Sequence, residues 1–188
     1  MGGACTRQWV GYAPSSMRRI NVVGTSCSGK TTLARELAAR LGLPHVEIDA
    51  LYWGPGWKGL PMATFRARLE EALDADAWIA DGGYEMARDI TWRRAELVVW
   101  LDYSLAVVLG RWSRRTVRRI RSQEEFWPGT GNRESLRNAL RADGLLWWIL
   151  RTHRRRRRRM VERLVRRPDL QVVRLRSPAA ARRWLATV

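Results

Sequence analysis

A glycine-rich segment near the start of the chain, GTSCSGKT at residues 24–31, constrains the fold more than any other feature of the sequence. It follows a short β-branched run at 20–23 and precedes an amphipathic stretch at 31–41. Each fixed position of the pattern G-x-x-x-x-G-K-[ST] is matched, with a predicted strand before it and a predicted helix after it. The glycines let successive backbone N–H groups turn inward, and the helix directs its positive end at the same point. The segment therefore predicts a phosphate-binding loop, or P-loop.

The residue types in this loop indicate which ligand it would hold. The Lys30 ammonium can reach the β- and γ-phosphates of a nucleoside triphosphate, and the Thr31 hydroxyl can ligate Mg²⁺. A Gly/Ser turn arising by chance would not require a strand on one side and a helix on the other. We therefore expect ATP and Mg²⁺ as cofactors. The predicted nucleotide-binding residues are Gly24, Thr25, Ser26, Cys27, Ser28, Gly29, Lys30, Thr31 and Thr32.

Beyond the loop, the hydrophobic pattern alternates between strands and helices. The predicted strands cover 20–23, 45–48, 78–80, 97–101 and 170–175, and the predicted helices cover 31–41, 63–73, 105–121, 133–142, 144–166 and 178–185. Such alternation indicates parallel βαβ units with right-handed crossovers. We predict a three-layer α/β/α P-loop NTPase fold with a five-stranded parallel sheet in residues 17–188. Residues 1–16 have no apolar periodicity, which predicts a disordered tail.

Composition limits the setting and the partners of the chain. No apolar run approaches the roughly 20 residues that a bilayer span needs, and no apolar segment follows a basic start as in a signal peptide. The two cysteines, Cys5 and Cys27, cannot build a disulfide framework. These features favour a cytoplasmic protein, which we expect to be a monomer or a homodimer. The formal net charge of +17 predicts anionic partners, among them nucleotides, phosphorylated metabolites, nucleic acid and acidic membrane surfaces.

Most of the positive charge lies in one half of the chain, because residues 111–167 hold 19 arginines and five acidic residues. One predicted helix face carries the helical spacing i, i+3, i+4, i+7 at Arg111, Arg114, Arg115 and Arg118. This helix leads into a polar loop at 121–132, which we expect to act as a lid that excludes water. Arg133 and Arg137 begin the next helix and are predicted to close on the site from the other side.

Six consecutive arginines, Arg154–Arg159, stand in a later predicted helix. On a helix they point in all directions, so they cannot all face one site. Two interpretations stay open: a solvated helix with snorkelling side chains, or contact with nucleic acid or another acidic surface. We expect weak nucleic-acid binding at most, and we expect the neighbouring His153 on the surface.

Acidic and aromatic side chains mark the acceptor side of the predicted site. Asp49, Asp81 and Asp102 follow three predicted strands, and ligands of open α/β sheets bind beyond the carboxyl ends of strands. Asp102 is interpreted as a structural turn residue. The aromatic residues predicted to line an acceptor pocket are Tyr52, Trp53, Trp57 and Tyr84. Those predicted to pack in the core, because they stand in apolar runs, are Trp78, Trp100 and Trp147.

The segment GTSCSGKTTLA at 24–34, on a short chain with five predicted strands, resembles the small nucleoside and nucleotide kinases, including adenylate and shikimate kinases. A closer resemblance is to bacterial P-loop proteins called DNA topology modulation proteins, often described as adenylate-kinase-like. It also rests on HVEIDALYWGPGW at 45–57, WIADGGY at 78–84 and RSPAAARRWL at 176–185, and it covers about residues 17–188. The resemblance implies a nucleotide-kinase-like fold.

The resemblance also implies roles for charged side chains. In adenylate kinases an Asp-Gly pair ends the third strand and its Asp holds Mg²⁺ through water; Asp81-Gly82 looks like that pair. Those kinases carry two phosphate-clamping arginines four residues apart, beginning nine residues beyond the Asp that ends the fourth strand. Arg111 and Arg115 have that spacing from Asp102. Both arginines are therefore expected to neutralise charge on the transferring phosphoryl group.

The positions of the acceptor hydroxyl and of the adenine ring are also expected from resemblance. Shikimate-type kinases have an acid after the second strand, near the acceptor hydroxyl, so Asp49 is the candidate for orienting that hydroxyl. The alternative is that Asp49 only caps the following turn. The adenine is expected near Arg176, after the fifth strand. The predicted catalytic residues are Lys30, Asp49, Arg111 and Arg115, and the predicted acceptor-binding residues are Asp49, Tyr52, Trp53, Trp57, Gly82, Tyr84, Arg88, Arg133 and Arg137.

The chain departs from adenylate kinases in three ways. No Asp-Gly-Phe-Pro-Arg sequence follows the third strand, the AMP-binding segment is missing, and the lid is the short SQEEFWPGTGN loop. AMP is therefore not the acceptor that we expect. The predicted function is ATP-dependent phosphoryl transfer to a nucleotide, a nucleoside or a hydroxy-metabolite. The alternative is a nucleotide-binding regulator associated with nucleic acid, which the charge of residues 111–167 favours.

Overall fold

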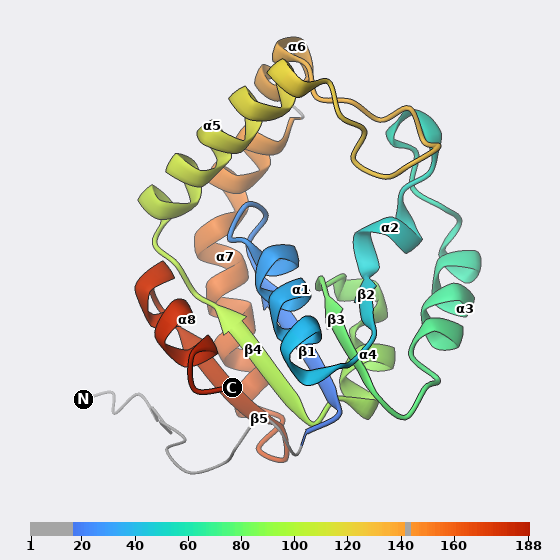
Figure 1. The fold of residues 1–188 in the computed structure, drawn as a ribbon, viewed down its shortest axis with the longest axis vertical. Helices are drawn as coiled ribbons and strands as arrows, with labels where there is room; N and C mark the ends of the chain where they lie inside the picture. The colour runs from blue at the N-terminus through green and yellow to red at the C-terminus, as the bar shows by residue number, and fades with distance from the viewer. Residues whose placement is uncertain (1–16, 142–143) are drawn as a thin grey trace.

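The computed structural model describes residues 17–141 and 144–188, so the predicted tail at 1–16 lies outside the described residues. All strand pairs are parallel and form one five-stranded sheet in the order β2-β3-β1-β4-β5 (Figure 1). The strands are β1 (Arg19–Gly24), β2 (His45–Glu47), β3 (Trp78–Asp81), β4 (Leu97–Leu101) and β5 (Gln171–Leu175). The central strand, β1, leads directly into the P-loop.

Helices cover both faces of the sheet. They are α1 (Lys30–Leu41), α2 (Ile48–Tyr52), α3 (Met62–Ala72), α4 (Arg88–Arg94), α5 (Leu105–Ser122), α6 (Leu136–Leu140), α7 (Leu145–Val165) and α8 (Pro178–Leu185). Two short 3₁₀ turns, η2 (Pro55–Trp57) and η3 (Glu85–Ala87), lie in the connections. This arrangement confirms the predicted three-layer α/β/α fold.

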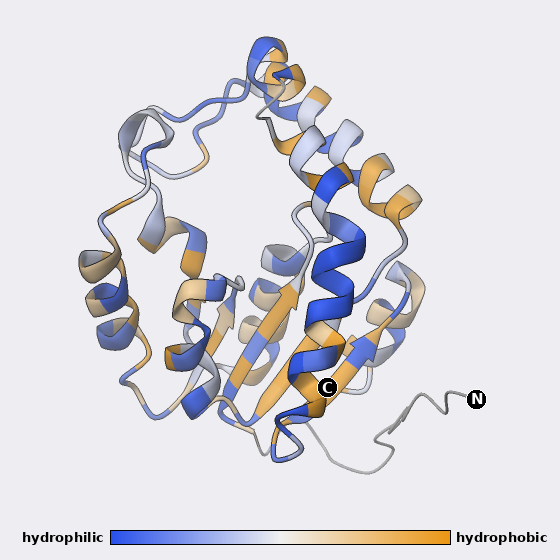
Figure 2. Ribbon diagram, turned by 180° about the vertical axis from the view of Figure 1, so that it is seen from behind, coloured by the Kyte–Doolittle hydropathy of each residue, from blue (hydrophilic) through white to orange (hydrophobic). Residues whose placement is uncertain are grey.

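The core has two halves because successive strand side chains point to opposite faces of the sheet. Val22 packs with α1, α5 and α8 on one face, whereas Val23 packs with α3 and α4 on the other. Helix α7 contributes to both halves, through Ile149 near its start and Met160 further along. Its middle turns are hydrophilic and lie across the back of the sheet (Figure 2).

Several predicted boundaries agree with the structure and others do not. The fourth strand and the last helix have the predicted bounds, whereas the helix expected at 133–142 is only α6, Leu136–Leu140. The connection between the predicted strand at 45–48 and the predicted helix at 63–73 contains most of α2 and the turn η2. Helix α4 had no sequence signal at all. A helix of seven residues is marginal by propensity, and α4 depends on burying Ile90 and Trp92.

Two expectations about single side chains in α7 are wrong. His153 is buried, and its Nε2 lies 3.0 Å from the carbonyl oxygen of Tyr103, instead of lying on the surface. Trp147 is 42% exposed rather than packed in the core, while Trp78 and Trp100 are buried as predicted. The reason is helical phase: His153 lies four residues after the buried Ile149, on the same face, and Trp147 points the other way.

Within residues 17–141 and 144–188, no helix has the length and apolarity to cross a membrane.

Asp102 is buried and accepts hydrogen bonds from Arg174 at 2.6 Å and from Arg157 at 3.2 Å. These bonds tie β4, β5 and α7 together. The contacts are those of a structural carboxylate, which is how the sequence was interpreted.

Candidate active site

The P-loop has the backbone that its glycines allow. Gly29 has φ +91° and caps α1 in a left-handed conformation, which side chains other than glycine rarely adopt. A Cβ atom on Gly24 would lie only 2.9 Å from the carbonyl oxygen of Leu101, so β1 and β4 approach too closely for a side chain. Lys30 folds back, with Nζ 3.3 Å from the carbonyl oxygen of Thr25. The Ser28 hydroxyl is buried in the loop without a hydrogen-bond partner among the described residues.

A hydroxyl and a carboxylate meet at the start of α1. Thr31 Oγ1 donates to Asp81 Oδ2 at 2.6 Å, and Asp81 is only 2% exposed at the end of β3. The other carboxylate oxygen, Oδ1, lies 2.7 Å from Nε2 of His45, the first residue of β2. Parallel pairing of β2 with β3 makes this contact possible. The contact of His45 with Asp81 was not predicted, because a lone histidine at the start of a strand does not indicate which side chain it will meet.

These groups fit Mg²⁺ and a nucleotide phosphate. Hard cations prefer hydroxyl and carboxylate oxygens, and Thr31 and Asp81 supply both beside the loop. The buried Ser28 hydroxyl and the positive end of α1 suit a phosphate oxygen. Lys30 supplies a positive charge at the same place. When bound, Mg²⁺ would neutralise phosphate charge.

Two of the four arginines predicted on one face of α5 reach the site. Arg111 Nη1 donates to the carbonyl oxygen of Ser28 at 3.1 Å, and its guanidinium lies 5.7 Å from the centre of the Tyr103 ring. Arg115 is half-buried, 5.5 Å from the centre of the Phe126 ring, and its Nε has no partner among the described residues. Helix α5 therefore brings Arg111 to the P-loop, and the positive charge of Arg115 is near enough to oppose the rise that burial causes in the pKa of Cys27 in that loop.

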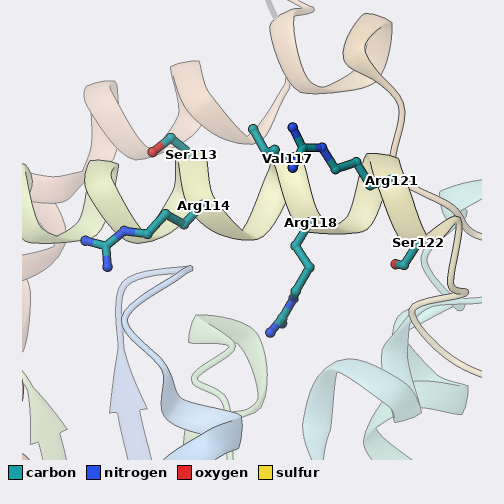
Figure 3. Close-up of a pocket in the computed structure, with 6 residues that line it drawn as sticks. All are labelled: Ser113, Arg114, Val117, Arg118, Arg121 and Ser122. Atoms are coloured by element: carbon teal, nitrogen blue, oxygen red, sulfur yellow. The ribbon is translucent and has the colours of Figure 1, made fainter.

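The other two arginines of that face, Arg114 and Arg118, are exposed. They line a shallow groove along α5, which Figure 3 shows, together with Ser113, Val117, Arg121 and Ser122. Arg118 points away from the helix, on the side opposite Val117 and Arg121 (Figure 3). The four arginines predicted on one helix face thus form two pairs: one pair is half-buried and the other is exposed.

The aromatic residues predicted for the acceptor side form one cluster. The Tyr52 ring lies 4.8 Å from the ring of Trp53 and 4.7 Å from that of Tyr84, measured between centroids, and Trp57 lies 6.2 Å from Trp53. Asp49 stands in the first turn of α2, close enough to Tyr84 for its negative charge to act on the Tyr84 hydroxyl. Burial raises the pKa of the Tyr84 hydroxyl, and the negative charge of Asp49 raises it further. Asp49 therefore lies near Tyr84, beside the aromatic cluster.

Gly82 allows close packing beside this cluster. A Cβ atom on Gly82 would lie 2.9 Å from Cβ of Ile48, so a side chain here would displace α2 and Asp49.

Other residues predicted for the site lie further from it. Thr32, Arg137 and Arg176 are exposed, and Arg133 is exposed with its guanidinium 3.7 Å from Glu125. Arg133 thus pairs within the segment after α5.

That segment, residues 123–135, reaches from α5 to the loop that follows α2 (Figure 1). Asn132 bonds to both sides of this loop: its Nδ2 donates to the carbonyl oxygen of Gly54 at 2.9 Å, and its Oδ1 accepts from the Trp57 amide at 3.0 Å. Trp127 Nε1 donates to Glu47 at 3.0 Å, and the ring of Phe126 lies 4.8 Å from that of Trp57. The predicted lid is therefore joined to the aromatic side of the site.

A buried glutamate, Glu134, also lies in this segment and was not predicted. Burial raises the pKa of the Glu134 carboxyl, while Arg115 and Arg119 oppose that rise. The carboxylate thus lies beside Arg115 and Arg119, and the Nε atoms of both are buried without partners among the described residues. A single glutamate in a polar loop carries no pattern that sequence analysis could detect.

Comparisons with solved structures agree with this architecture. A shikimate kinase from Bacteroides thetaiotaomicron superposes with a TM-score of 0.55 at 14% identity, covering 90% of this chain and 95% of that one. The chain has the fold of the P-loop kinases. A sugar kinase from Janibacter sp. HTCC2649 gives 0.53 at 23% identity, covering 90% and 93%. A shikimate kinase from Acinetobacter baumannii, in complex with shikimate, gives 0.53 at 19% identity, covering 93% and 92%.

At these identities the likeness concerns the fold alone. A scan against protein families finds no match, and a search of the curated proteins finds none either. The function must therefore be argued from the site itself.

Proposed function

We propose that the protein is an ATP-dependent phosphotransferase that moves the γ-phosphoryl group to a hydroxyl of a small acceptor. Lys30 and the P-loop amides hold the donor phosphates, and Thr31 with Asp81 handles Mg²⁺. Arg111 and Arg115 stabilise charge on the transferring group. Asp49 orients the acceptor hydroxyl and takes up its proton as the new oxygen–phosphorus bond forms and the bond to the β-phosphate oxygen breaks.

One observation carries this proposal. The carboxyl edge of a single parallel sheet holds a P-loop, a Thr31–Asp81 pair at 2.6 Å and an Asp49–Tyr84 pair beside aromatic walls. A nucleotide switch needs the first two features, whereas a carboxylate beside aromatic walls suits the acceptor of a transfer reaction. The superposed kinases are consistent with the proposal through their fold.

A second candidate function rests on a different observation. Arg154, Arg155 and Arg158 on α7 are exposed, and none of the ion pairs among the described residues includes them. Exposed arginines of this kind suit the backbone phosphates of nucleic acid. A nucleotide-binding regulator associated with nucleic acid is therefore the alternative, and it makes no use of Asp49.

The test compares the two lysines of the chain. Lys30→Ala should reduce acceptor-dependent ADP release from ATP at least tenfold, because a charge-assisted bond to phosphate is worth about 1.5–3 kcal/mol. Lys58→Ala is the matched control, since Lys58 is exposed and should leave the rate unchanged. The assay screens nucleosides, nucleotides and small hydroxy-metabolites as acceptors. Equal turnover in a folded Lys30→Ala variant would contradict the proposal.

A further inference from the structure

Helix α7 has one side that is exposed along its whole length. Residues 147, 151, 154, 158, 161 and 165 are four and three positions apart in turn, a spacing that keeps their side chains on one side of a helix. All six are exposed, whereas Ile149 and His153 on the opposite side are buried. At 1.5 Å per residue this stripe is about 27 Å long. The outer stripe, as we call it, consists of Trp147, Arg151, Arg154, Arg158, Val161 and Val165.

Large apolar side chains lie at both ends of the outer stripe. Trp147 stands at one end and Val165, which is 74% exposed, at the other. Leu150 is exposed one turn after Trp147, and α6, which packs on α7, adds Leu136 and Leu140, 63% and 54% exposed. Helix α6 lies where α5 ends and α7 begins (Figure 1). Side chains of this size gain free energy when they leave water, so this end of the molecule suits contact with an apolar phase.

The middle of the outer stripe is positively charged. None of the ion pairs among the described residues includes Arg151, Arg154 or Arg158. Arg151 packs over the ring of Trp147, 5.8 Å from its centroid. Glu162 is the one acidic residue in the sequence of α6 and α7. The stripe therefore attracts an anionic partner, and it repels a second copy of the chain, which would bring arginines against arginines.

Arginines on the inner side of the same helix have a different setting. Arg157 and Arg159 pair with Asp102 and Glu85. Arg88, which the sequence analysis predicted for the acceptor side, lines a small cavity together with both of these arginines. The charges of Arg157 and Arg159 are thus balanced within the protein, unlike those of the outer stripe.

The apolar ends of the outer stripe distinguish between two kinds of large anionic partner. The phosphates of a nucleic-acid duplex would suit the arginines but offer nothing to Trp147 or Val165. A bilayer that contains anionic lipids offers phosphates among its head groups and an apolar layer just below them. Tryptophan is favoured at that level, because its ring is apolar and its N–H is polar. Arginine can keep its guanidinium among the phosphates while its stem lies along apolar surface.

We propose that the outer stripe of α7, together with the exposed leucines of α6, binds the anionic surface of a lipid bilayer without crossing it. Arg151, Arg154 and Arg158 contact the lipid phosphates, and Trp147 and the neighbouring leucines enter the boundary between head groups and acyl chains. The inference does not depend on the proposed function, because none of these side chains belongs to the proposed active site.

The binding test measures co-sedimentation of the full-length protein with sucrose-loaded vesicles. One set of vesicles is phosphatidylcholine alone, and the other contains about one third phosphatidylglycerol. The wild type should bind the anionic vesicles at least tenfold more tightly, because each arginine near an anionic surface adds to the affinity. Absent binding, or equal binding to both sets, would overturn the inference.

Apolar variants test whether the contact is local. Leu136→Ser combined with Trp147→Ser should weaken binding to the anionic vesicles about tenfold, since both side chains are expected at the acyl boundary. Met62→Ser combined with Met86→Ser removes two exposed apolar side chains from α3 and η3 and is the matched control. Equal losses in the two double variants would overturn the inference. Melting temperatures check the fold, and Val165→Ser, at the other end of the stripe, gives a second variant.

Charge variants separate the outer stripe from net charge. Changing Arg151, Arg154 and Arg158 together to Gln should weaken binding to anionic vesicles more than the same change at three exposed arginines of α5, which removes equal charge. Equal weakening would overturn the inference. The control arginines are Arg114, Arg118 and Arg121.

Two further outcomes would assign the outer stripe to another partner. Leu136→Ser with Trp147→Ser should leave the affinity for duplex DNA at the wild-type level. If this double variant lowers DNA affinity and leaves vesicle binding unchanged, the stripe is a nucleic-acid surface and the inference fails. A dimer in sedimentation velocity that Trp147→Ser dissociates, with no binding to vesicles, would show that a second copy covers the stripe and would also overturn it.

Discussion

The Asp81 carboxylate is held from both sides, by the Thr31 hydroxyl at 2.6 Å and by His45 Nε2 at 2.7 Å. Thr31 and Asp81 would hold Mg²⁺ in the proposed site, and the His45 bond would keep Asp81 in place there. His45 is thus a positioning residue that acts through Asp81. Groups that orient a metal-handling carboxylate in this way commonly affect metal affinity by 10- to 100-fold.

At the residue scale we predict that His45→Phe raises the Mg²⁺ concentration needed for half-maximal binding of an ATP analogue about tenfold. The ring keeps the volume of the side chain but cannot donate to Asp81. His45→Gln can still donate and should recover part of the affinity. A fluorescent ATP analogue titrated with Mg²⁺ gives the measurement. Equal Mg²⁺ dependence in the wild type and His45→Phe would show that the bond has no positioning role.

At the element scale, the segment at 123–135 and the loop after α2 behave as one structure. Asn132 is only 2% exposed, and both of its amide atoms bond to backbone groups of the other segment, at Gly54 and Trp57. Trp57 and Phe126 pack edge to face between them. We expect this segment, as the proposed lid, to move together with the aromatic side of the proposed acceptor site. Binding of the acceptor is therefore expected to be coupled to lid position.

We predict that Asn132→Ala loosens the lid without unfolding the sheet. Two hydrogen bonds are lost, each worth about 0.5–1.5 kcal/mol, and two backbone groups lose their partner. Trypsin should then cleave after Arg133 severalfold faster than in the wild type, while the melting temperature changes little. Ser122→Ala, an exposed change at the end of α5, is the control and should leave the cleavage rate unchanged. Unchanged cleavage in Asn132→Ala would mean that the aromatic contacts alone hold the lid.

At the scale of the whole molecule, some of the arginines behind the net charge of +17 make contacts within the protein, and others are exposed to solvent. Arg156, Arg157 and Arg159 contact Gly83, Asp102 and Glu85, although Arg157 is itself exposed. Arg154, Arg155 and Arg158 are exposed and remain free to meet an anionic surface. The run of six is therefore neither a wholly solvated helix nor a continuous nucleic-acid grip. Arg154, Arg155 and Arg158, which none of the ion pairs of the described residues includes, are the members most available to a polyanion.

We predict weak binding of duplex DNA that salt abolishes, with a slope of log affinity against log salt of about 0.9 for each phosphate neutralised. Changing Arg154, Arg155 and Arg158 together to Gln should flatten the slope by at most about 2.7. The same change at Arg114, Arg118 and Arg121 on α5 removes equal charge and is the matched control. Fluorescence anisotropy over a salt series measures both. Equal flattening in the two triple variants would mean that net charge, and not α7, drives the binding.

Much of this protein follows from the sequence itself. The P-loop, the parallel sheet and the bounds of β4 and α8 depend on neighbouring residues, because turn chemistry and hydrophobic period are local properties. The positions of Asp49 and Asp81 at one edge follow from the rule that parallel strands end together. The aromatic cluster on the acceptor side could be predicted for the same reason, since its members follow the second and third strands.

Other features were decided only by the tertiary structure. The bond between His45 and Asp81 depends on the pairing of β2 with β3, and the bonds of Asn132 depend on where the lid crosses the molecule. Whether Arg156 points inward and Arg158 outward depends on the phase of α7 against the sheet. These contacts join residues that lie 36 to 78 positions apart in the chain. Local sequence carries no record of such distances, because packing of the whole core sets strand order and helix rotation, and these in turn select the partners.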